Sequence, residues 1–254
     1  MTTIVRIAAM ISATTLLLGC GGSDSNDVLD DLNANRAKWE NENIDTYQFE
    51  YQVSCFCTEE TVLPRLVLVE GSQVTSQTII EGNIALPLDD AYAESIDSLY
   101  QLISLEESRA ESLSVKYDPE LGYPTEIKVD INEQTADDEY TLTISNLVAE
   151  GDVACTATVE AGLLLSVTDQ TTQMPIACGL TATAMEEAYS ETVMVDDSDC
   201  ADDDLIAILD ERPGFYSLTV QKQGYQDYQV DNIGIGKDLC HVLTREFNVE
   251  LVPE

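Results

Sequence analysis

The chain has 254 residues, of which 48 are acidic and 11 are basic, and its formal net charge is −37. So large a negative charge excludes nucleic acid and anionic lipid headgroups as partners, because proteins bind both through Lys and Arg. A hydrophobic fraction of 44% is too high for a disordered chain, and the length suggests two domains. We interpret the charge as an adaptation to a salty environment rather than as the sign of a specific cationic partner.

Residues 1–19 are expected to form a signal peptide. Arg6 precedes an apolar stretch from Ile7 to Leu18, which is shorter than the roughly 20 residues that a bilayer-spanning helix needs. The stretch leads into Leu-Leu-Gly-Cys, which ends at Cys20. This tetrapeptide resembles the bacterial lipobox, and the resemblance implies that Cys20 is lipidated and becomes the first residue of the mature protein. The alternative is an ordinary signal peptide with a chance cysteine at its end.

Residues 20–34 are expected to hold the lipidated Cys20 and a flexible tether. The positions after Cys20 carry Gly, Ser, Asp and Asn, a composition typical of flexible linkers. Gly21 rather than Asp follows the cysteine, which resembles outer-membrane sorting of lipoproteins in Gram-negative bacteria. We therefore expect a protein of the cell envelope that contacts the membrane through the lipid on Cys20.

Residues 35–150 are expected to form an α+β domain, in which a helix covers one face of an antiparallel sheet. Apolar residues at helical spacing predict helices at residues 28–41 and 96–103. Alternating apolar and polar residues predict strands near residues 47–53, 66–69, 74–80, 113–117, 127–131 and 140–144.

Residues 151–254 are expected to form an all-β sandwich. Short apolar alternations predict strands near residues 163–167, 189–195, 216–220, 228–230 and 247–251, and no helical period lies between them. The pattern changes near Gly151, which is where we place the domain boundary.

Several motifs follow one another in the first half, at residues 35–148. Trp39 is followed by Tyr47-x-Phe49, Cys55-Phe56-Cys57, Tyr117-Asp118-x-x-x-Gly122-Tyr123-Pro124-Thr125 and Asp137-Asp138-Glu139. This order resembles a family of bacterial envelope domains whose function is unassigned. The resemblance implies a fold and no activity.

Two sequence motifs are characteristic of the second half, at residues 158–252. The first runs from Asp169 to Ile176, and the second is Arg212-Pro-Gly-Phe-Tyr216 followed by Gly224-Tyr225. Together they resemble the carboxypeptidase regulatory-like domain, although this chain has Gln173 where that family has Gly and Cys178-Gly179 where it has an Ala-rich strand entry. The resemblance implies a transthyretin-type β-sandwich that acts as an accessory or binding module and carries no catalytic site.

Six cysteines remain besides Cys20, and exported proteins commonly join theirs in disulfides. The first half contains Cys55 and Cys57, and the second contains Cys155, Cys178, Cys200 and Cys240. Separately folding domains leave three connectivities, of which we predict Cys55–Cys57, Cys155–Cys178 and Cys200–Cys240.

The Cys55-x-Cys57 pair has two alternative interpretations, a redox dithiol and a metal site. A structural zinc ion needs four ligands, and this half contains no third cysteine. We favour the disulfide. Since residues i and i+2 of a regular strand lie about 6.6 Å apart, this bond requires the strand to end or pinch at Phe56.

His241 is the only histidine. Its side chain and that of Cys240 should point to opposite faces of a strand, which argues against a Cys–His pair. The chain contains no Gly-x-Ser-x-Gly motif that would supply a nucleophile for a catalytic triad. We therefore predict a structural role for His241 and no catalytic residues.

Acidic residues are densest between positions 196 and 204. Because Ca²⁺ takes several carboxylate oxygens, weak candidate ligands are Asp197, Asp199, Asp202 and Asp203. Counting from Asp197, the sixth position is Asp202, where the EF-hand loop requires Gly. We expect a solvated loop, with neither a metal nor a cofactor.

The sequence thus predicts a non-enzymatic cell-envelope lipoprotein that acts as a binding, interaction or structural module. Its expected partner is an unidentified envelope protein or glycan. One alternative is a Ca²⁺- or glycan-binding surface module, with Tyr123, Tyr225 and Tyr228 as candidate sugar platforms. The other alternative is a thiol-redox lipoprotein that uses Cys55 and Cys57.

Overall fold

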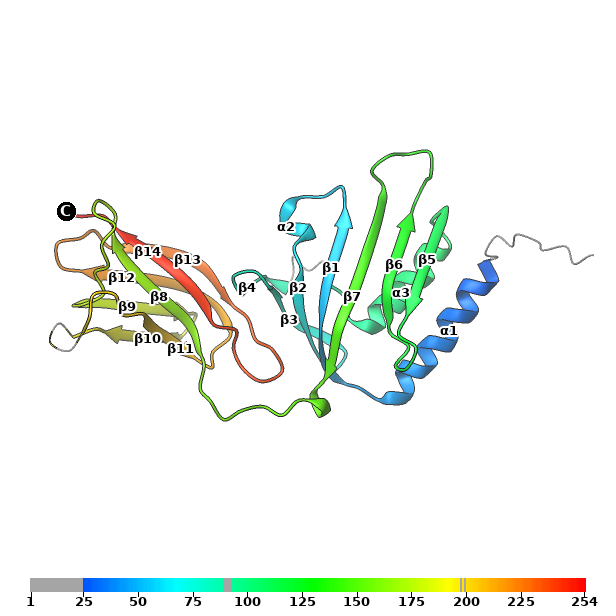
Figure 1. Cartoon of the computed structure of the whole chain (residues 1–254), viewed down its shortest axis with the longest axis horizontal. Coiled ribbons are helices and arrows are strands. Elements are labelled where there is room, and N and C mark those ends of the chain that lie inside the picture. Colours follow the sequence, from blue (N-terminus) through cyan, green and yellow to red (C-terminus); the bar gives the residue numbers. More distant parts are fainter. Residues whose placement is uncertain (1–24, 89–92, 197, 199) are drawn as a thin grey trace, which may run out of the picture.

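A computed structural model describes residues 25–88, 93–196, 198 and 200–254. The expected signal peptide and Cys20 therefore lie outside the described residues, as do Asp197 and Asp199. The protein is mostly β, with large antiparallel sheets. Figure 1 shows α1 (Ser25–Glu42) near one end of the molecule and the C-terminus at the other.

The first half contains both helices and strands. After α1, the elements are β1 (Thr46–Cys55), α2 (Glu59–Val62), β2 (Arg65–Glu70), β3 (Gln73–Ile79), β4 (Ile84–Ala85), α3 (Ile96–Glu107), β5 (Ser112–Tyr117), β6 (Pro124–Asp130) and β7 (Glu139–Ala149). These agree closely with the ranges that periodicity predicts. The expectation of a flexible tether over residues 20–34 is wrong from Ser25 on, because those residues belong to α1, whose Leu32 is buried in the core. The two-residue strand β4 and the single-turn helix α2 were not predicted from the sequence, because neither is long enough to show a period.

The core of the first half forms where the two long helices meet one face of the sheet. Tyr47 and Phe49 of β1 are almost fully buried on that face, together with Ile96 of α3. Trp39 of α1 packs edge-on against Tyr47, with 5.1 Å between ring centroids. Helix α3 begins at Ser95, whose hydroxyl accepts a hydrogen bond from the Ser98 N–H and so caps the helix.

The second half consists of strands joined by loops, after a short 3₁₀ segment, η2 (Glu150–Asp152). The strands are β8 (Ala161–Asp169), β9 (Leu180–Glu186), β10 (Tyr189–Met194), β11 (Ile206–Asp210), β12 (Gly214–Lys222), β13 (Tyr228–Ile235) and β14 (Arg245–Leu251). Strands β11, β8 and β14 make a small sheet, in which β14 runs parallel to β8. Their apolar residues share a core with those of β9, β12 and β13, which gives a sandwich-like pair of sheets.

A single sheet of eleven strands runs through both halves. Its order is β10-β9-β12-β13-β4-β3-β2-β1-β7-β6-β5. The link is β4, in which Ile84 pairs with Ile79 of β3 on one side and with Ile235 of β13 on the other. The two halves have separate hydrophobic cores but are continuous in backbone hydrogen bonding.

The disulfides include one expected bond and two that correct the prediction. Cys55 and Cys57 are joined, and β1 ends at Cys55 as that bond requires. The predicted Cys155–Cys178 and Cys200–Cys240 bonds are wrong, because the bonds present are Cys155–Cys240 and Cys178–Cys200.

The error came from expecting a local hairpin around the first strand of the sandwich. Strand β8 instead pairs with β11 and β14, whereas β9 lies in the other sheet. Cys178 precedes β9 and Cys200 follows β10, so the β9–β10 hairpin brings these two cysteines together.

Candidate functional site

The loop between β13 and β14, residues 236–244, docks the second half onto the first, and we call it the junction loop. The Lys237 ammonium lies 2.9 Å from the Glu70 carboxylate at the end of β2. The Leu239 N–H donates a hydrogen bond to the Gln48 side-chain oxygen of β1, at 2.9 Å. Because side chains alternate along a strand, Gln48 points away from the face that α1 and α3 cover. The junction loop therefore contacts the opposite face of the sheet.

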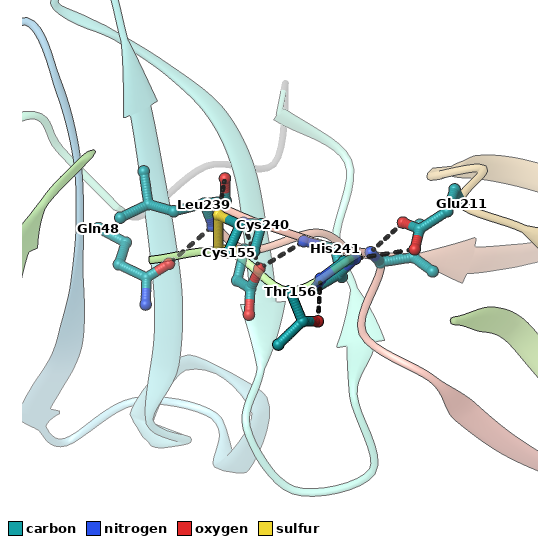
Figure 2. The surroundings of a disulfide bond; sticks show 9 residues. Gln48, Cys155, Thr156, Glu211, Leu239, Cys240 and His241 are labelled. Carbon is teal, nitrogen blue, oxygen red and sulfur yellow. Dashed lines mark hydrogen bonds and ion pairs between the residues drawn. A yellow bond between two sulfur atoms is a disulfide. The ribbon is translucent and has the colours of Figure 1, made fainter. Parts of the chain in front are cut away.

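A disulfide ties the junction loop to the segment that connects the two halves. Cys240 belongs to the loop, and Cys155 belongs to the linker, residues 153–160, between η2 and β8. Figure 2 shows this bond beside the Gln48 contact. The bond closes a loop of 85 positions and gathers the linker, the junction loop and β1 at one place.

His241 extends this attachment to a third segment of the second half. Its Nδ1 lies 2.8 Å from Glu211 Oε1, and its Nε2 lies 3.1 Å from Thr156 Oγ1 (Figure 2). Glu211 also accepts hydrogen bonds from the N–H groups of Glu160, at 2.9 Å, and Val242, at 3.3 Å. The hydrogen bond from the Glu160 N–H and, as a smaller effect, the hydrogen bond with His241 hold the pKa of the Glu211 carboxyl below its usual range.

These three side chains stand in the order carboxylate, imidazole, hydroxyl, which is the order of a catalytic triad. Sequence reasoning missed the grouping, since Thr156 and Glu211 lie 85 and 30 positions from His241. Thr156 follows Cys155 directly and His241 follows Cys240, so two of the three residues are adjacent to the disulfide, and Glu211 comes from the turn between β11 and β12. We interpret the group as a structural tie among the linker, the junction loop and the β11–β12 turn.

A cavity of about 350 Å³ lies where the two halves meet. Thr58, Thr61 and residues 84–87 line it from the first half, and Asn232 and Arg245 line it from the second. Burial lowers the pKa of the Arg245 guanidinium. One of its nitrogens donates a hydrogen bond to the Gly234 carbonyl, at 3.2 Å.

The segment from Tyr117 to Pro124 forms a turn that contacts α1 and holds it in place. The Asp118 carboxylate accepts hydrogen bonds from the N–H groups of Glu120 and Leu121, at 2.9 and 2.7 Å. Gly122 has a φ of +84°, and a Cβ there would overlap the Asn35 carbonyl of α1. Only glycine combines an easily adopted positive φ with the absence of a Cβ, which explains its position in this motif.

Residues 31–149 match a family of proteins of unknown function. They form a DUF6174 domain. The match begins inside α1 and ends at the last residue of β7, so it includes the Cys55–Cys57 bond and the Gly122 turn. This agrees with the resemblance to a family of unassigned function, whereas the resemblance of the second half stays a prediction. No curated protein matches the chain.

The Cys55–Cys57 bond of the DUF6174 domain borders a cavity of about 270 Å³. Phe56 between the two cysteines is 81% exposed. Asp137, Asp138 and Glu139 line the same cavity. Reactive cysteines occur in electropositive surroundings, and these carboxylates disfavour a thiolate. The surroundings thus favour a structural bond over a redox pair.

Two carboxylates of the acidic loop between β10 and β11 accept hydrogen bonds from backbone N–H groups. Asp202 Oδ1 accepts from the Cys178 N–H, at 3.4 Å, and Asp204 Oδ2 accepts from the Ala201 N–H, at 2.9 Å. Asp203 is exposed. Among the described residues, no group of three or more His, Cys, Asp or Glu side chains could hold a metal ion.

The three tyrosines considered as sugar platforms lie in different places. Tyr123 is 8% exposed and packs against Trp39 in the DUF6174 core, so it is unsuited to stacking against a sugar. Tyr225 donates a hydrogen bond to Asp169 Oδ2 at 2.9 Å, and Tyr228 packs against the sandwich core.

None of the helices in the described ranges is long and apolar enough to cross a membrane.

Proposed function

We propose that the protein is a non-enzymatic lipoprotein of the cell envelope, which holds a two-domain interaction or structural module outside the cytoplasm. In this proposal Cys20 carries the lipid, and the tether is the part of residues 20–34 that precedes α1. Residues 35–150 form an α+β domain of the DUF6174 family, and residues 151–254 form a carboxypeptidase regulatory-like β-sandwich.

The observation that carries the proposal is the attachment of the two halves to each other. The junction loop binds the first half through Lys237 and Leu239, and the Cys155–Cys240 bond fixes the linker to that loop. Strand β4 adds backbone pairing between the halves. Such reinforcement suits a rigid module that presents surfaces at a set spacing, rather than two domains that move against each other.

The cysteine chemistry supports export. All six cysteines of the described chain are joined in three disulfides, and such bonds persist in oxidising compartments outside the cytoplasm. A flexible tether before α1 would let the module stand away from the membrane.

The test is lipid labelling and fractionation of the full-length protein in a bacterial host. The wild type should take up labelled palmitate and partition with outer membranes, and Cys20→Ala should do neither. Cys57→Ala is the matched control, since it removes a cysteine outside the lipobox and should keep the label. Labelled Cys20→Ala, or an unlabelled wild type, would contradict the proposed anchor.

A second experiment addresses the interaction role. Crosslinking in intact envelopes should give a discrete adduct with the wild type. The adduct should weaken in Cys155→Ser/Cys240→Ser, in which both domains remain but their attachment is loosened. An adduct of unchanged yield in that variant would contradict the need for a rigid pair.

A further inference from the structure

Several basic residues of the described chain have no described carboxylate within 4.0 Å, and Arg245 is the one among them that lines the cavity between the halves. Lys237, Arg36 and Arg109 each have a carboxylate within 4.0 Å, as expected when acids outnumber bases 48 to 11. For Arg245, no described carboxylate lies within that distance, although its side chain is partly buried at the start of β14. A desolvated charge without a counter-charge costs free energy.

The surroundings of Arg245 leave donors for a ligand. Its guanidinium has five N–H donors, and the hydrogen bond to the Gly234 carbonyl uses one nitrogen. The guanidinium carbon lies 5.6 Å from the centre of the Phe247 ring, which holds the group on one side. Arg245 also lines the cavity of about 350 Å³ between the halves, which we call the junction cavity.

The cavity has the size and position of a small-molecule site. Its volume of about 350 Å³ falls within the range of roughly 300–1,000 Å³ for ligand pockets, which form preferentially between domains. Residues 84–87, which are Ile, Ala, Leu and Pro, form an apolar wall, and Thr58 and Thr61 contribute hydroxyl groups. The cavity therefore combines an apolar wall with the guanidinium groups of Arg245 and Arg65, and Arg65 donates hydrogen bonds to the Glu60 and Thr61 carbonyls.

Charge restricts the ligand further. Arg65 and Glu60 also line the cavity, so the formal charge of the lining is +1, and the chain as a whole carries −37 charges. This balance suits a monoanion, because the net negative charge of the chain repels a dianion such as phosphate more strongly. A planar carboxylate can also take two parallel hydrogen bonds from a guanidinium.

We propose that the junction cavity binds a small organic monocarboxylate, with its carboxylate on Arg245 and its apolar body against residues 84–87. Since the two halves contribute to the cavity jointly, bound ligand would also strengthen their attachment. This inference is independent of the lipid anchor and of the proposed envelope partner.

The test is calorimetric titration of the purified mature protein with butyrate and with butyramide, at constant ionic strength. Butyramide has a similar shape but lacks the charge. Butyrate should bind saturably, and butyramide should bind at least about tenfold more weakly, because hydrogen bonds between charged groups are worth more than neutral ones.

Two variants locate the site. Arg245→Gln should weaken butyrate binding at least about tenfold. Arg36→Gln removes the same charge from α1, where Arg36 pairs with Glu40, and should leave binding unchanged. Thr58→Trp fills the mouth of the cavity from an exposed position and should also abolish binding. It keeps the test valid if Arg245→Gln fails to fold.

Each of the following results would overturn the proposal. One is the absence of saturable butyrate binding at millimolar concentrations, and another is equal binding of butyrate and butyramide. The others are butyrate binding that Thr58→Trp leaves intact and butyrate binding that Arg36→Gln weakens as much as Arg245→Gln does.

Discussion

Replacing both cysteines of the Cys155–Cys240 bond with serine is expected to destabilise the protein more than removing either other disulfide. Restricting the unfolded chain over 85 positions contributes about 4.6 kcal/mol in the loop-entropy relation. In the unfolded chain, the intact Cys178–Cys200 bond shortens this loop by 22 positions. The contribution of the Cys155–Cys240 bond is thereby lowered to about 4.3 kcal/mol. The same relation yields about 3.4 kcal/mol for Cys178–Cys200 and about 1–2 kcal/mol for Cys55–Cys57, because their loops are shorter.

Thermal and urea unfolding can measure this loss with two signals. Trp39 is the only tryptophan and lies in the DUF6174 core, so its fluorescence reports on the first half. Far-ultraviolet circular dichroism reports on all strands. At about 2–4 °C per kcal/mol, a loss of 4.3 kcal/mol lowers the Tm by about 9–17 °C. The dichroism transition should shift more than the Trp39 transition, because Cys155 and Cys240 lie outside that core.

The control proteins are Cys178→Ser/Cys200→Ser and Cys55→Ser/Cys57→Ser, each of which removes one disulfide. The free energies of unfolding should fall in the order of loop length. If Cys55→Ser/Cys57→Ser loses as much stability as Cys155→Ser/Cys240→Ser, loop entropy does not govern these bonds. If the two signals of Cys155→Ser/Cys240→Ser still coincide, the bond is not what joins the unfolding of the halves.

Three further predictions concern the junction, acid stability and cations. Gly236→Ala places a Cβ against Thr78 Oγ1 and should cost about 1–3 kcal/mol in thermal unfolding, whereas Gly151→Ala, which meets nothing within 4 Å, should cost far less. The lowered pKa of Glu211 means that its stabilisation is present above its unfolded-state pKa and is lost as the pH falls through the folded-state value. The Tm of Glu211→Gln should therefore fall less steeply than that of the wild type between about pH 5 and pH 3, and equal slopes would contradict this account. Calcium titration of the full chain should show only weak, salt-sensitive binding to the acidic loop, and a stoichiometric site of micromolar affinity would refute this expectation.

Elements with a strong local period were predictable from the sequence. Tyr47 and Phe49 alternate with polar residues in β1, and Ile96 and Ile103 lie on one face of α3, as their spacing indicated. These patterns lie within a few neighbouring residues, where apolar burial dictates the period. Strand β9 escaped prediction because Ala182 and Ala184 occupy its buried positions and alternate only weakly with Thr. Strand β11 is short and follows the acidic loop, which concealed its period.

The sequence by itself determined the local elements, the similarity of the first half to a family of unassigned function, and the pairing of Cys55 with Cys57, which are only two positions apart. Only the tertiary structure decided the partner of Cys155, the contacts of His241 and the position of Arg245 in a cavity between the halves. Each of these depends on strand order, which brings together segments separated by many positions. Local periodicity specifies which face of a strand is buried, but it carries no information about which distant strand will lie beside it.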